Sequence, residues 1–479
     1  MTFVSAAFVV FLLALFVLYY TLPRSWQWPL LLVAGYIFYA FAGPTFLIYV
    51  VATTITAWYG TLRIHRLQLE QKDYLAQNKS TLDREGRKQY KSKMKKRQQI
   101  WFWSALLFNI GLLAIVKYTD FVIFNINSLM SVFNSGGKLD FLDIALPLGM
   151  SFYTFQTVGY VIDVYRAKHP PEKNLFKLGL FVSFFPQMIQ GPISRFSDLA
   201  PDLYSQHQFD SDKFSQGIQR ILWGFFKKVV IADRVIAAVS TIFQEPDQYR
   251  GIYVFVGMIF YALQLYADFT GGIDITIGIA QALGIGLKEN FERPFFAKST
   301  AEYWRRWHIT MGTWFRDYIF YPLSVSKPML KLSNNSRKLL GSGFGRRFPV
   351  YVSTIIVWFT TGLWHGASWN FVVWGLLNGL VIIISQELEP FYDVFHRKFS
   401  VAGKTWFRMF QVARTFFLMS SIRLLDCYRD VGLTFRQYLS MFTEFDLSVI
   451  SNGSMLELGL SLADYVLLAV GTIMLTSVS

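Results

Sequence analysis

One histidine lies inside a long apolar stretch of this chain. His365 belongs to the segment WHGASWN (residues 364–370), within a run that is otherwise apolar from Tyr351 to Ser385. Ionisable groups at membrane depth are costly to bury and usually serve a function. Because the ordinary pKa of histidine lies near neutrality, a desolvated imidazole can take a proton from a substrate hydroxyl and return it. The pattern therefore predicts His365 as a general base.

Two other interpretations of His365 stay open on the sequence alone. The ring could be a hydrogen-bonded histidine of the protein core, or it could pair with His308 in a haem or metal site. The sequence places no third ligand of metal type at short spacing from either histidine, so it favours catalysis over a metal site.

His308 lies among aromatic and cationic residues. It follows the segment YWRRW (303–307), and Trp314 and Arg316 come shortly after it. At helical spacing the aromatic rings stack on one side while the arginines supply cations, as in a belt at the membrane surface. Alternatively, the guanidinium groups hold phosphates of a donor whose entry the rings line. The other four histidines lie among charged or loop residues and are expected at the surface: His65, His169, His207 and His396.

The composition is typical of a polytopic membrane protein. Of 479 residues, 53% are hydrophobic and only 16% are charged, whereas soluble chains carry about a quarter charged residues. The net charge of +15 is expected to collect in cytoplasmic loops, so nucleic-acid binding is not predicted. A single cysteine, Cys427, excludes an internal disulfide and a cysteine-built metal site. We expect Cys427 to be incidental or lipidated rather than catalytic.

Apolar stretches long enough to cross the bilayer, or nearly so, recur along the whole chain. They cover residues 2–22, 28–62, 101–132, 141–164, 175–193, 214–231, 252–287, 351–385, 406–425 and 458–478. Since a helical span takes about twenty residues, some stretches hold two crossings. The sequence predicts an all-α, polytopic integral membrane protein with roughly ten to twelve transmembrane helices in a single domain over residues 1–479. The first stretch lacks the basic start of a secretory signal and is expected to be retained.

Glycine and proline interrupt several of these stretches, which predicts broken or re-entrant helices. At membrane depth such residues are tolerated where the freed backbone groups face protein or a water-filled cavity, so the interior is expected to be hollow. The interruptions are Gly43-Pro44, Pro147-Leu148-Gly149, Phe185-Pro186-Gln187, Gly191-Pro192 and Thr270-Gly271-Gly272.

Two basic segments are predicted as loops. Residues 63–99 are dense in Lys and Arg near their end, with enough helix-forming residues for an amphipathic helix, and the charge places them in the cytoplasm. This segment either sets topology and contacts anionic lipid, or receives an acidic donor or carrier. The second segment, residues 327–347, links the regions of the two candidate catalytic histidines.

Several motifs together resemble the membrane-bound O-acyltransferase (MBOAT) superfamily, in its bacterial branch. WRRWH (304–308) and WHGASWN (364–370) are similar to its paired signatures. PLGMSFYTFQ (147–156), FFPQ (184–187) through GPI (191–193), and DFTGGID (268–274) resemble further motifs of that branch. The five motifs occur in order and cover nearly the whole chain.

The resemblance implies transfer of an acyl group, delivered as a thioester on the cytoplasmic side, through a central tunnel to a hydroxyl acceptor outside. It implies that His365 is catalytic and that His308 is a second important histidine near the tunnel. No bound cofactor or metal is expected; the co-substrate is acetyl-CoA or an acyl-carrier phosphopantetheine. The candidate substrate- and donor-binding residues are Trp304, Arg305, Arg306, Trp307, Trp364, Asn370, Asp268 and Gln187.

Within that branch, the sequence looks closer to the AlgI-type O-acetyltransferases of exopolysaccharide systems than to the DltB-type D-alanyl transferases of teichoic acid. The expected partners are membrane lipid, the thioester donor and an exported acetyltransferase or acceptor protein, and the expected location is the bacterial cytoplasmic membrane. The sequence departs from the AlgI-type pattern in two places. After YPL (321–323) a longer basic loop stands where that pattern has glycines, and the final apolar run stops where a basic tail and a further helix are expected. A transporter or flippase is the alternative class, although no repeated halves are evident.

Overall fold

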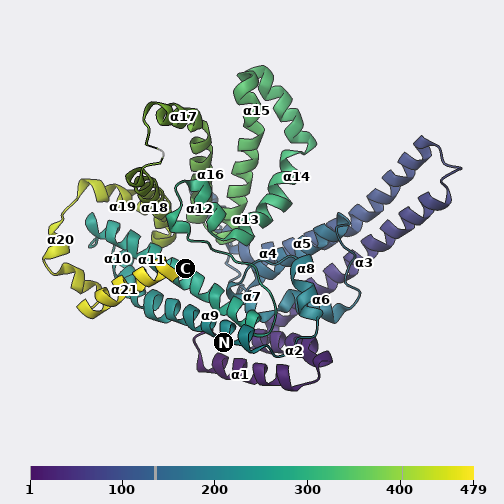
Figure 1. The fold of residues 1–479 in the computed structure, drawn as a ribbon. Helices are drawn as coiled ribbons and strands as arrows, with labels where there is room; N and C mark the ends of the chain where they lie inside the picture. The colour runs from purple at the N-terminus through teal and green to yellow at the C-terminus, as the bar shows by residue number, and fades with distance from the viewer. Residues whose placement is uncertain (1, 134–136, 402, 479) are drawn as a thin grey trace. The chain divides into compact units, whose positions relative to one another are not determined.

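The computed structural model describes residues 2–133, 137–401 and 403–478, which group into two compact units (Figure 1). The first unit contains Met1–Ile221 and Thr276–Lys288, and the second contains Leu222–Ile275 and Glu289–Ser479. Within the described ranges the regular structure is helical, apart from one isolated antiparallel bridge between Phe291 and Trp307. The predicted all-α class is confirmed.

The first unit is built from helices of very different lengths. They are α1 (Ala6–Thr21), η1 (Arg24–Trp26), α2 (Gln27–Ala40), η2 (Pro44–Phe46), α3 (Leu47–Gln77), α4 (Arg84–Val132), α5 (Met150–Tyr165), α6 (Leu175–Ser183), α7 (Phe185–Gln190), α8 (Phe196–Tyr204) and most of α9 (Ser211–Phe225). The end of α11 also belongs to this unit.

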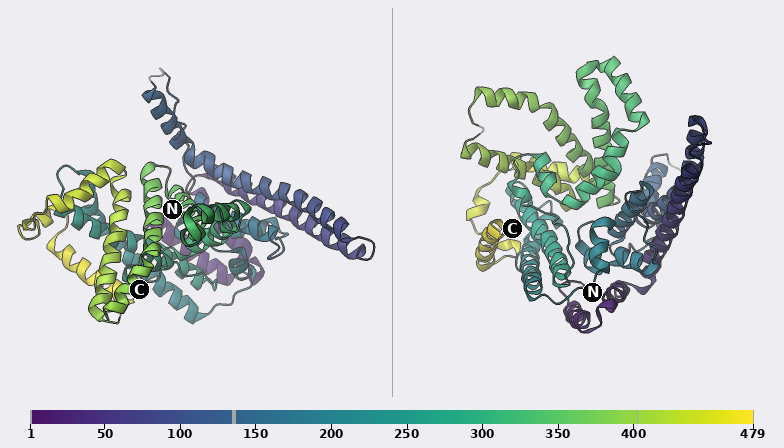
Figure 2. Two further views of the ribbon diagram at one scale, coloured as in Figure 1. Left: turned by 90° about the horizontal axis from the view of Figure 1, so that it is seen from above. Right: turned by 45° about the vertical axis from the view of Figure 1, so that its right-hand side comes forward.

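The basic segment 63–99 continues two long helices and is not an irregular loop. Helices α3 and α4 lie side by side over most of their length (Figures 1 and 2), and Tyr74 stacks on Tyr90 near the far end at 3.9 Å. Asp83 caps the start of α4, because its Oδ1 accepts a hydrogen bond from the Gly86 N–H at 2.7 Å. Lys, Arg, Gln and Glu are good helix formers, so both helices extend past their apolar parts into a helical hairpin.

The second unit contains the elements that carry both candidate catalytic histidines. They are η3 (Phe226–Ala232), α10 (Asp233–Gln244), α11 (Ile252–Ala282, as far as Ile275), η4 (Pro294–Phe296), α12 (Thr300–Arg306), α13 (Ile309–Phe315), η5 (Arg316–Phe320), α14 (Tyr321–Ser324), α15 (Lys327–His365), α16 (Trp369–Glu387), α17 (Glu389–Lys398), α18 (Thr405–Tyr428), α19 (Val431–Thr443), α20 (Ser448–Ser451), η6 (Ser454–Leu458) and α21 (Leu462–Val478).

Four helices of the described chain are long and apolar enough to cross a membrane, by length and composition. They span Pro44–Gln77, Arg84–Val132, Ile252–Ala282 and Trp369–Glu387. Three shorter apolar helices accompany them, at Ala6–Thr21, Leu175–Gln190 and Leu462–Ser477. Apolar helices therefore recur from one end of the described chain to the other, as a polytopic membrane protein requires.

The expected break at Thr270-Gly271-Gly272 is wrong, because α11 runs through it without interruption. Gly271 serves packing instead. A Cβ atom on Gly271 would lie 2.8 Å from the backbone oxygen of Gly224, so the lack of a side chain lets the two backbones approach. Beside this contact, Lys227 of η3 forms a buried ion pair with Asp274 at 2.6 Å.

The basic segment 327–347 is also helical, which corrects the predicted loop. It forms the first part of α15, which Ser326 caps through the N–H of Met329. Gly341 breaks the helix with a positive φ of 77°, and the two arms fold back on each other there. The Ser336 hydroxyl donates to the Gly345 carbonyl across this turn at 2.7 Å. The longer second arm then delivers His365 at its end.

Candidate functional site

Helix α12 carries three of the candidate donor-binding residues and has a well-defined start. The Ser299 hydroxyl accepts a hydrogen bond from the Glu302 N–H at 3.2 Å, while the Glu302 carboxylate accepts one from the Lys298 N–H at 2.8 Å. This arrangement resembles a capping box and fixes where the helix begins. Trp304, Arg305 and Arg306 follow within two turns, so the cap sets their directions.

His308 does not continue a helix, which corrects the expectation that it lies in an intact helical pattern. Its φ of 51° and ψ of 50° are left-handed, and it separates α12 from α13. Asn290, which is fully buried, holds this turn from outside. Its Oδ1 accepts from the N–H and the hydroxyl of Thr310 at 3.0 and 2.8 Å, and its Nδ2 lies 3.2 Å from Nδ1 of His308. A left-handed non-glycine residue needs such external support.

Replacing Asn290 with alanine is expected to lower the free energy of unfolding by about 1–3 kcal/mol, because Thr310 loses a shared buried acceptor. Thermal unfolding of the purified protein in detergent measures the effect. Asn335→Ala is the matched control, since Asn335 is exposed on α15 and should leave the unfolding midpoint unchanged. An Asn290→Ala protein as stable as wild type would contradict the role of Asn290 in holding the turn.

Aromatic rings enclose the imidazole of His308, whose side chain is only 1% exposed. Phe269 of α11 meets it edge-on at 5.1 Å between ring centroids, and Phe291 stacks on it at 6.2 Å. His308 lies outside the four candidate spans, and burial, followed by the positive charge of Arg423, lowers its pKa to about 3. The ring is therefore neutral at physiological pH, with one nitrogen that donates a hydrogen bond and one that accepts.

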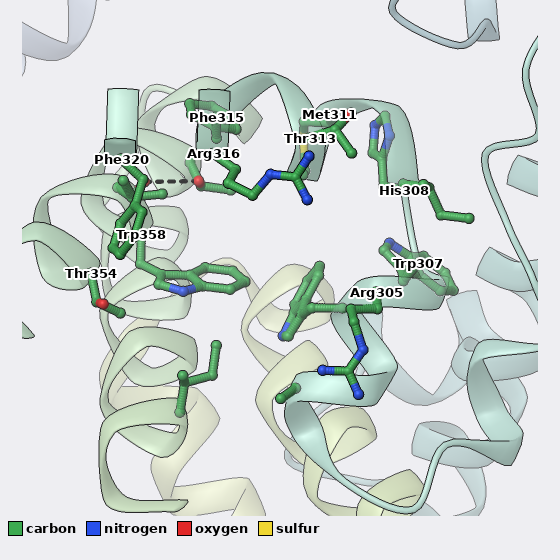
Figure 3. A pocket seen from close by; sticks show the side chains of 17 residues that line it. Arg305, Trp307, His308, Met311, Thr313, Phe315, Arg316, Phe320, Thr354 and Trp358 are labelled. Atoms are coloured by element: carbon green, nitrogen blue, oxygen red, sulfur yellow. Dashed lines mark hydrogen bonds between the residues drawn. The ribbon is translucent and has the colours of Figure 1, made fainter. Parts of the chain in front are cut away.

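His308 lines a pocket of about 560 Å³ between α12, α13, η5 and the apolar parts of α15 and α16 (Figure 3). The walls are largely apolar and include the rings of Trp304, Trp307 and Trp358. Two cations, Arg305 and Arg316, lie at opposite edges of the space, and both side chains are exposed to solvent. The structure thus brings together an imidazole, indole rings and guanidinium groups, as a site for a partly apolar anion requires.

His365 is the last residue of α15, where the chain turns into α16. The two helices approach closely because glycines face each other: a Cβ atom on Gly375 would lie 2.3 Å from the Trp358 carbonyl oxygen and 3.0 Å from Cα of Gly362. At Gly366 a Cβ atom would meet the Phe371 ring at 2.1 Å, so only glycine fits directly after His365. The turn therefore fixes the imidazole at the corner of the helix pair.

Trp364 connects the two histidines. Its ring contacts the His308 ring edge-on at 5.6 Å and the ring of its neighbour His365 at 5.0 Å. The imidazole of His365 also packs against Trp374 of α16 at 4.6 Å. His365 is partly exposed, whereas His308 and Trp364 are buried. In the described ranges, no three His, Cys, Asp or Glu side chains gather in a group that could hold a metal ion.

The other predicted site residues have partners that tie them to the fold. Asn370 accepts from the Ser368 hydroxyl at 2.5 Å and donates to the Leu425 carbonyl at 3.1 Å, which fastens α16 to α18. Arg306 pairs with Glu302 at 2.6 Å. Asp268 of α11 pairs with Lys228 of η3 at 2.6 Å.

Gln187 lies in the first unit, on the short helix α7. It is buried, and its Nε2 donates to the Pro192 carbonyl at 3.0 Å and to the Ser194 hydroxyl at 2.5 Å. The contacts of this side chain thus close the turn that follows α7, and its part in substrate binding stays a prediction.

Sequence reasoning did not single out three residues that shape the site: Asn290, Arg423 and Asp426. Arg423 and Asp426 are a charged pair near the end of the apolar stretch 406–425, and ionisable groups in such a stretch are a usable signal. Asn290 offered no comparable signal, because it follows Lys288 and Glu289 in a polar connection. Its role depends on contacts that only the folded chain reveals.

Comparison with known proteins gives a consistent result. The model of the membrane-bound O-acyltransferase family matches residues 170–425. The chain is similar to a protein named probable alginate O-acetylase AlgI from Azotobacter vinelandii, with 31% identity over 98% of this chain and 84% of that protein. It is 29% identical to a peptidoglycan O-acetyltransferase from Helicobacter pylori, over 78% of this chain and 66% of the relative. It is 28% identical to a teichoic acid D-alanyltransferase from Streptococcus thermophilus, over 50% of this chain and 56% of that protein.

Proposed function

This chain belongs to the membrane-bound O-acyltransferase family, and on that premise we propose that it transfers an acetyl group from a thioester donor to a hydroxyl of a cell-surface polysaccharide. The observation that carries the proposal is the chain of ring contacts from His308 through Trp364 to His365, beside a pocket that two arginines border. Membership in an acyltransferase family also favours chemistry over the transporter or flippase alternative.

In the proposed mechanism, the imidazole of His365 accepts the proton of the acceptor hydroxyl. The hydroxyl oxygen attacks the thioester carbonyl, the carbon–sulfur bond breaks, and the departing thiolate takes the proton back from the imidazolium. No acyl-enzyme is needed, and a positioned base of this kind contributes about 10²- to 10⁴-fold to the rate. The candidate oxyanion donors are the Trp364 indole, the neutral His308 ring and the amide of Asn370, one of whose two N–H groups donates to Leu425.

The donor is proposed to be acetyl-CoA, presented from the cytoplasmic face of the bacterial cytoplasmic membrane. Its phosphates suit the guanidinium groups of Arg305 and Arg316, and its pantetheine arm suits the aromatic walls of the pocket. The partners are a polysaccharide acceptor and an exported acetyltransferase that completes its modification. The basic end of the α3–α4 hairpin is proposed to lie in the cytoplasm, because of its positive charge.

The test is transfer of label by the purified, reconstituted protein. With acetyl-labelled CoA and an uronic acid polysaccharide or its oligosaccharides, label should leave the thioester and become ester-linked to the acceptor. Label that moves only from a D-alanyl carrier thioester to teichoic acid would support the D-alanyl alternative instead. Movement of acetyl-CoA or of the polysaccharide across the vesicle membrane without cleavage of the thioester would contradict the proposal.

Removing the pocket arginines should weaken donor binding. Arg305→Ala and Arg316→Ala are each expected to raise the KM for acetyl-CoA about tenfold with little change in kcat, since an exposed charge-assisted contact to phosphate is lost. Initial rates over a range of donor concentrations give both constants. Arg397→Ala serves as control because Arg397 is exposed on α17 and does not line the pocket. Unchanged KM values in both pocket variants would remove the arginines from the donor site.

A further inference from the structure

A buried arginine lies against the aromatic support of both candidate catalytic histidines. The side chain of Arg423, on α18, is 9% exposed, and its guanidinium carbon lies 4.9 Å from the ring centroid of Trp307, 5.1 Å from that of Trp374 and 6.0 Å from that of Trp304. Its Nη1 pairs with Asp426 one turn later at 3.1 Å. The guanidinium therefore makes cation–π contacts with three indole rings in addition to its ion pair with Asp426.

These rings are the ones that hold the histidines. Trp374 packs edge-on against the imidazole of His365 at 4.6 Å. Trp307 directly precedes His308 and meets Phe291 perpendicularly at 4.9 Å, while Phe291 stacks on the His308 ring. The guanidinium of Arg423 therefore contacts Trp374, which packs against His365, and Trp307, the residue directly before His308.

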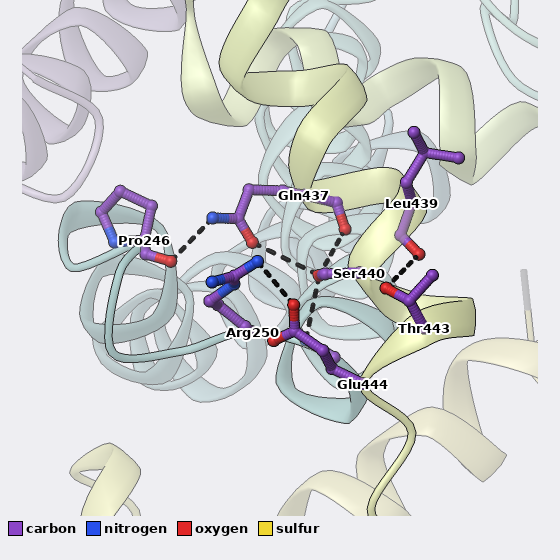
Figure 4. Close-up of polar contacts among 8 residues, drawn as sticks. Pro246, Arg250, Gln437, Leu439, Ser440, Thr443 and Glu444 are labelled. Carbon is purple, nitrogen blue, oxygen red and sulfur yellow. Dashed lines mark hydrogen bonds and ion pairs between the residues drawn. The ribbon is translucent and has the colours of Figure 1, made fainter.

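The end of α18 that carries Arg423 is firmly anchored. After Asp426 the chain turns at Arg429, with a φ of 54°, into α19. Figure 4 shows how α19 is fastened to the connection between α10 and α11. Gln437 donates to the Pro246 carbonyl at 2.7 Å, and Glu444 pairs with Arg250. Because this end of α18 is fixed, the guanidinium has a fixed place among the rings.

Burying an arginine in this space carries a large desolvation cost. Burying a charged pair costs much of what its attraction returns, and apolar side chains of similar volume often serve stability as well or better. A planar guanidinium offers what they do not, namely a flat cation that orients several rings at once. The arrangement is thus better explained by orientation of the rings than by packing alone.

We propose that Arg423 is a positioning residue for acyl transfer, which orients Trp374 and Trp307 and through them holds His365 and His308 in register. The inference rests on the proposed catalytic role of His365. In this proposal Arg423 acts on the histidines through the tryptophan rings and takes no part in the proton transfer or the acyl transfer. Its effect should therefore be larger in kcat than in the KM for the donor, which also changes because Trp307 lines the proposed donor pocket.

The test compares Arg423→Lys, which keeps the charge but loses the planar group, with Arg423→Met combined with Asp426→Asn, which removes both charges together. Each protein is assayed for acetyl transfer per mole of folded protein. We expect kcat to fall about tenfold or more in both, and the KM for acetyl-CoA to rise by a smaller factor. Arg408→Lys, an exposed arginine on the same helix, is the control and should change neither constant.

A coupling measurement separates positioning from general stability. If Arg423 acts through His365, then Arg423→Lys should have little further effect in a His365→Ala background. Wild-type kcat in Arg423→Lys, equal losses in both backgrounds, or failure of both Arg423 variants to fold would each overturn the inference. Full activity of His365→Ala alone would instead refute the proposed function, so the two failures are distinguishable.

Discussion

Replacing His365 with alanine is expected to lower kcat for acyl transfer by about 10²- to 10⁴-fold, because the acceptor hydroxyl loses its general base. The protein should still fold and enter the membrane, since the ring sits at the partly exposed corner between α15 and α16. Acetyl release from the labelled thioester and its appearance on the acceptor are measured for equal amounts of folded protein.

The matched control is His396→Ala. His396 lies on α17 in the same unit, and the rings beside it are Phe395 and Phe407. This variant should keep wild-type turnover. If His365→Ala turned over acetyl groups at the wild-type rate, the catalytic assignment of His365 would have to be withdrawn.

Two substitutions at His308 separate the chemistry of its ring from the strain of its backbone. His308→Gly and His308→Ala should both lower kcat about 10²-fold, as expected when a donor to the transition state is lost. They should differ in stability, because glycine adopts the left-handed conformation freely whereas alanine costs about 1–2 kcal/mol there. The glycine protein is therefore expected to unfold at the higher temperature of the two.

Rates per folded molecule and unfolding midpoints are needed together for this pair. If the two variants have equally reduced kcat values but different unfolding midpoints, the loss of activity is due to the missing imidazole. A glycine variant with wild-type kcat would show instead that His308 matters only as part of the turn. The comparison is possible because the left-handed backbone lies at the histidine itself.

The candidate site was partly predictable from the sequence. The aromatic and cationic segment around His308 and the apolar segment around His365 identified both histidines, and the structure links them through Trp364. The break at His308 was not predictable, since the tryptophans before and after it follow a continuous helical period. The break depends on Asn290, whose side chain acts from outside the pattern.

The fold, too, was predictable where it depends on neighbouring residues and unpredictable where it depends on residues remote in sequence. Apolar stretches identified a polytopic helical protein, because burial in lipid requires long apolar helices. The basic segment 327–347 was misjudged as a loop, although Lys and Arg favour helix, whereas the helix-forming residues of 63–99 did indicate helix there. Gly271 was misjudged for another reason: its packing partner, Gly224, is remote in sequence.

The anchoring of His308 by Asn290 also bears on the order in which the site assembles. These two residues are 18 positions apart, so the contact closes a short loop at little entropic cost. Trp364 and His365 come from a helix pair made much later in synthesis. The Asn290 contact therefore needs only a short segment of chain, whereas the contact of Trp364 with the His308 ring requires the α15–α16 pair to be in place.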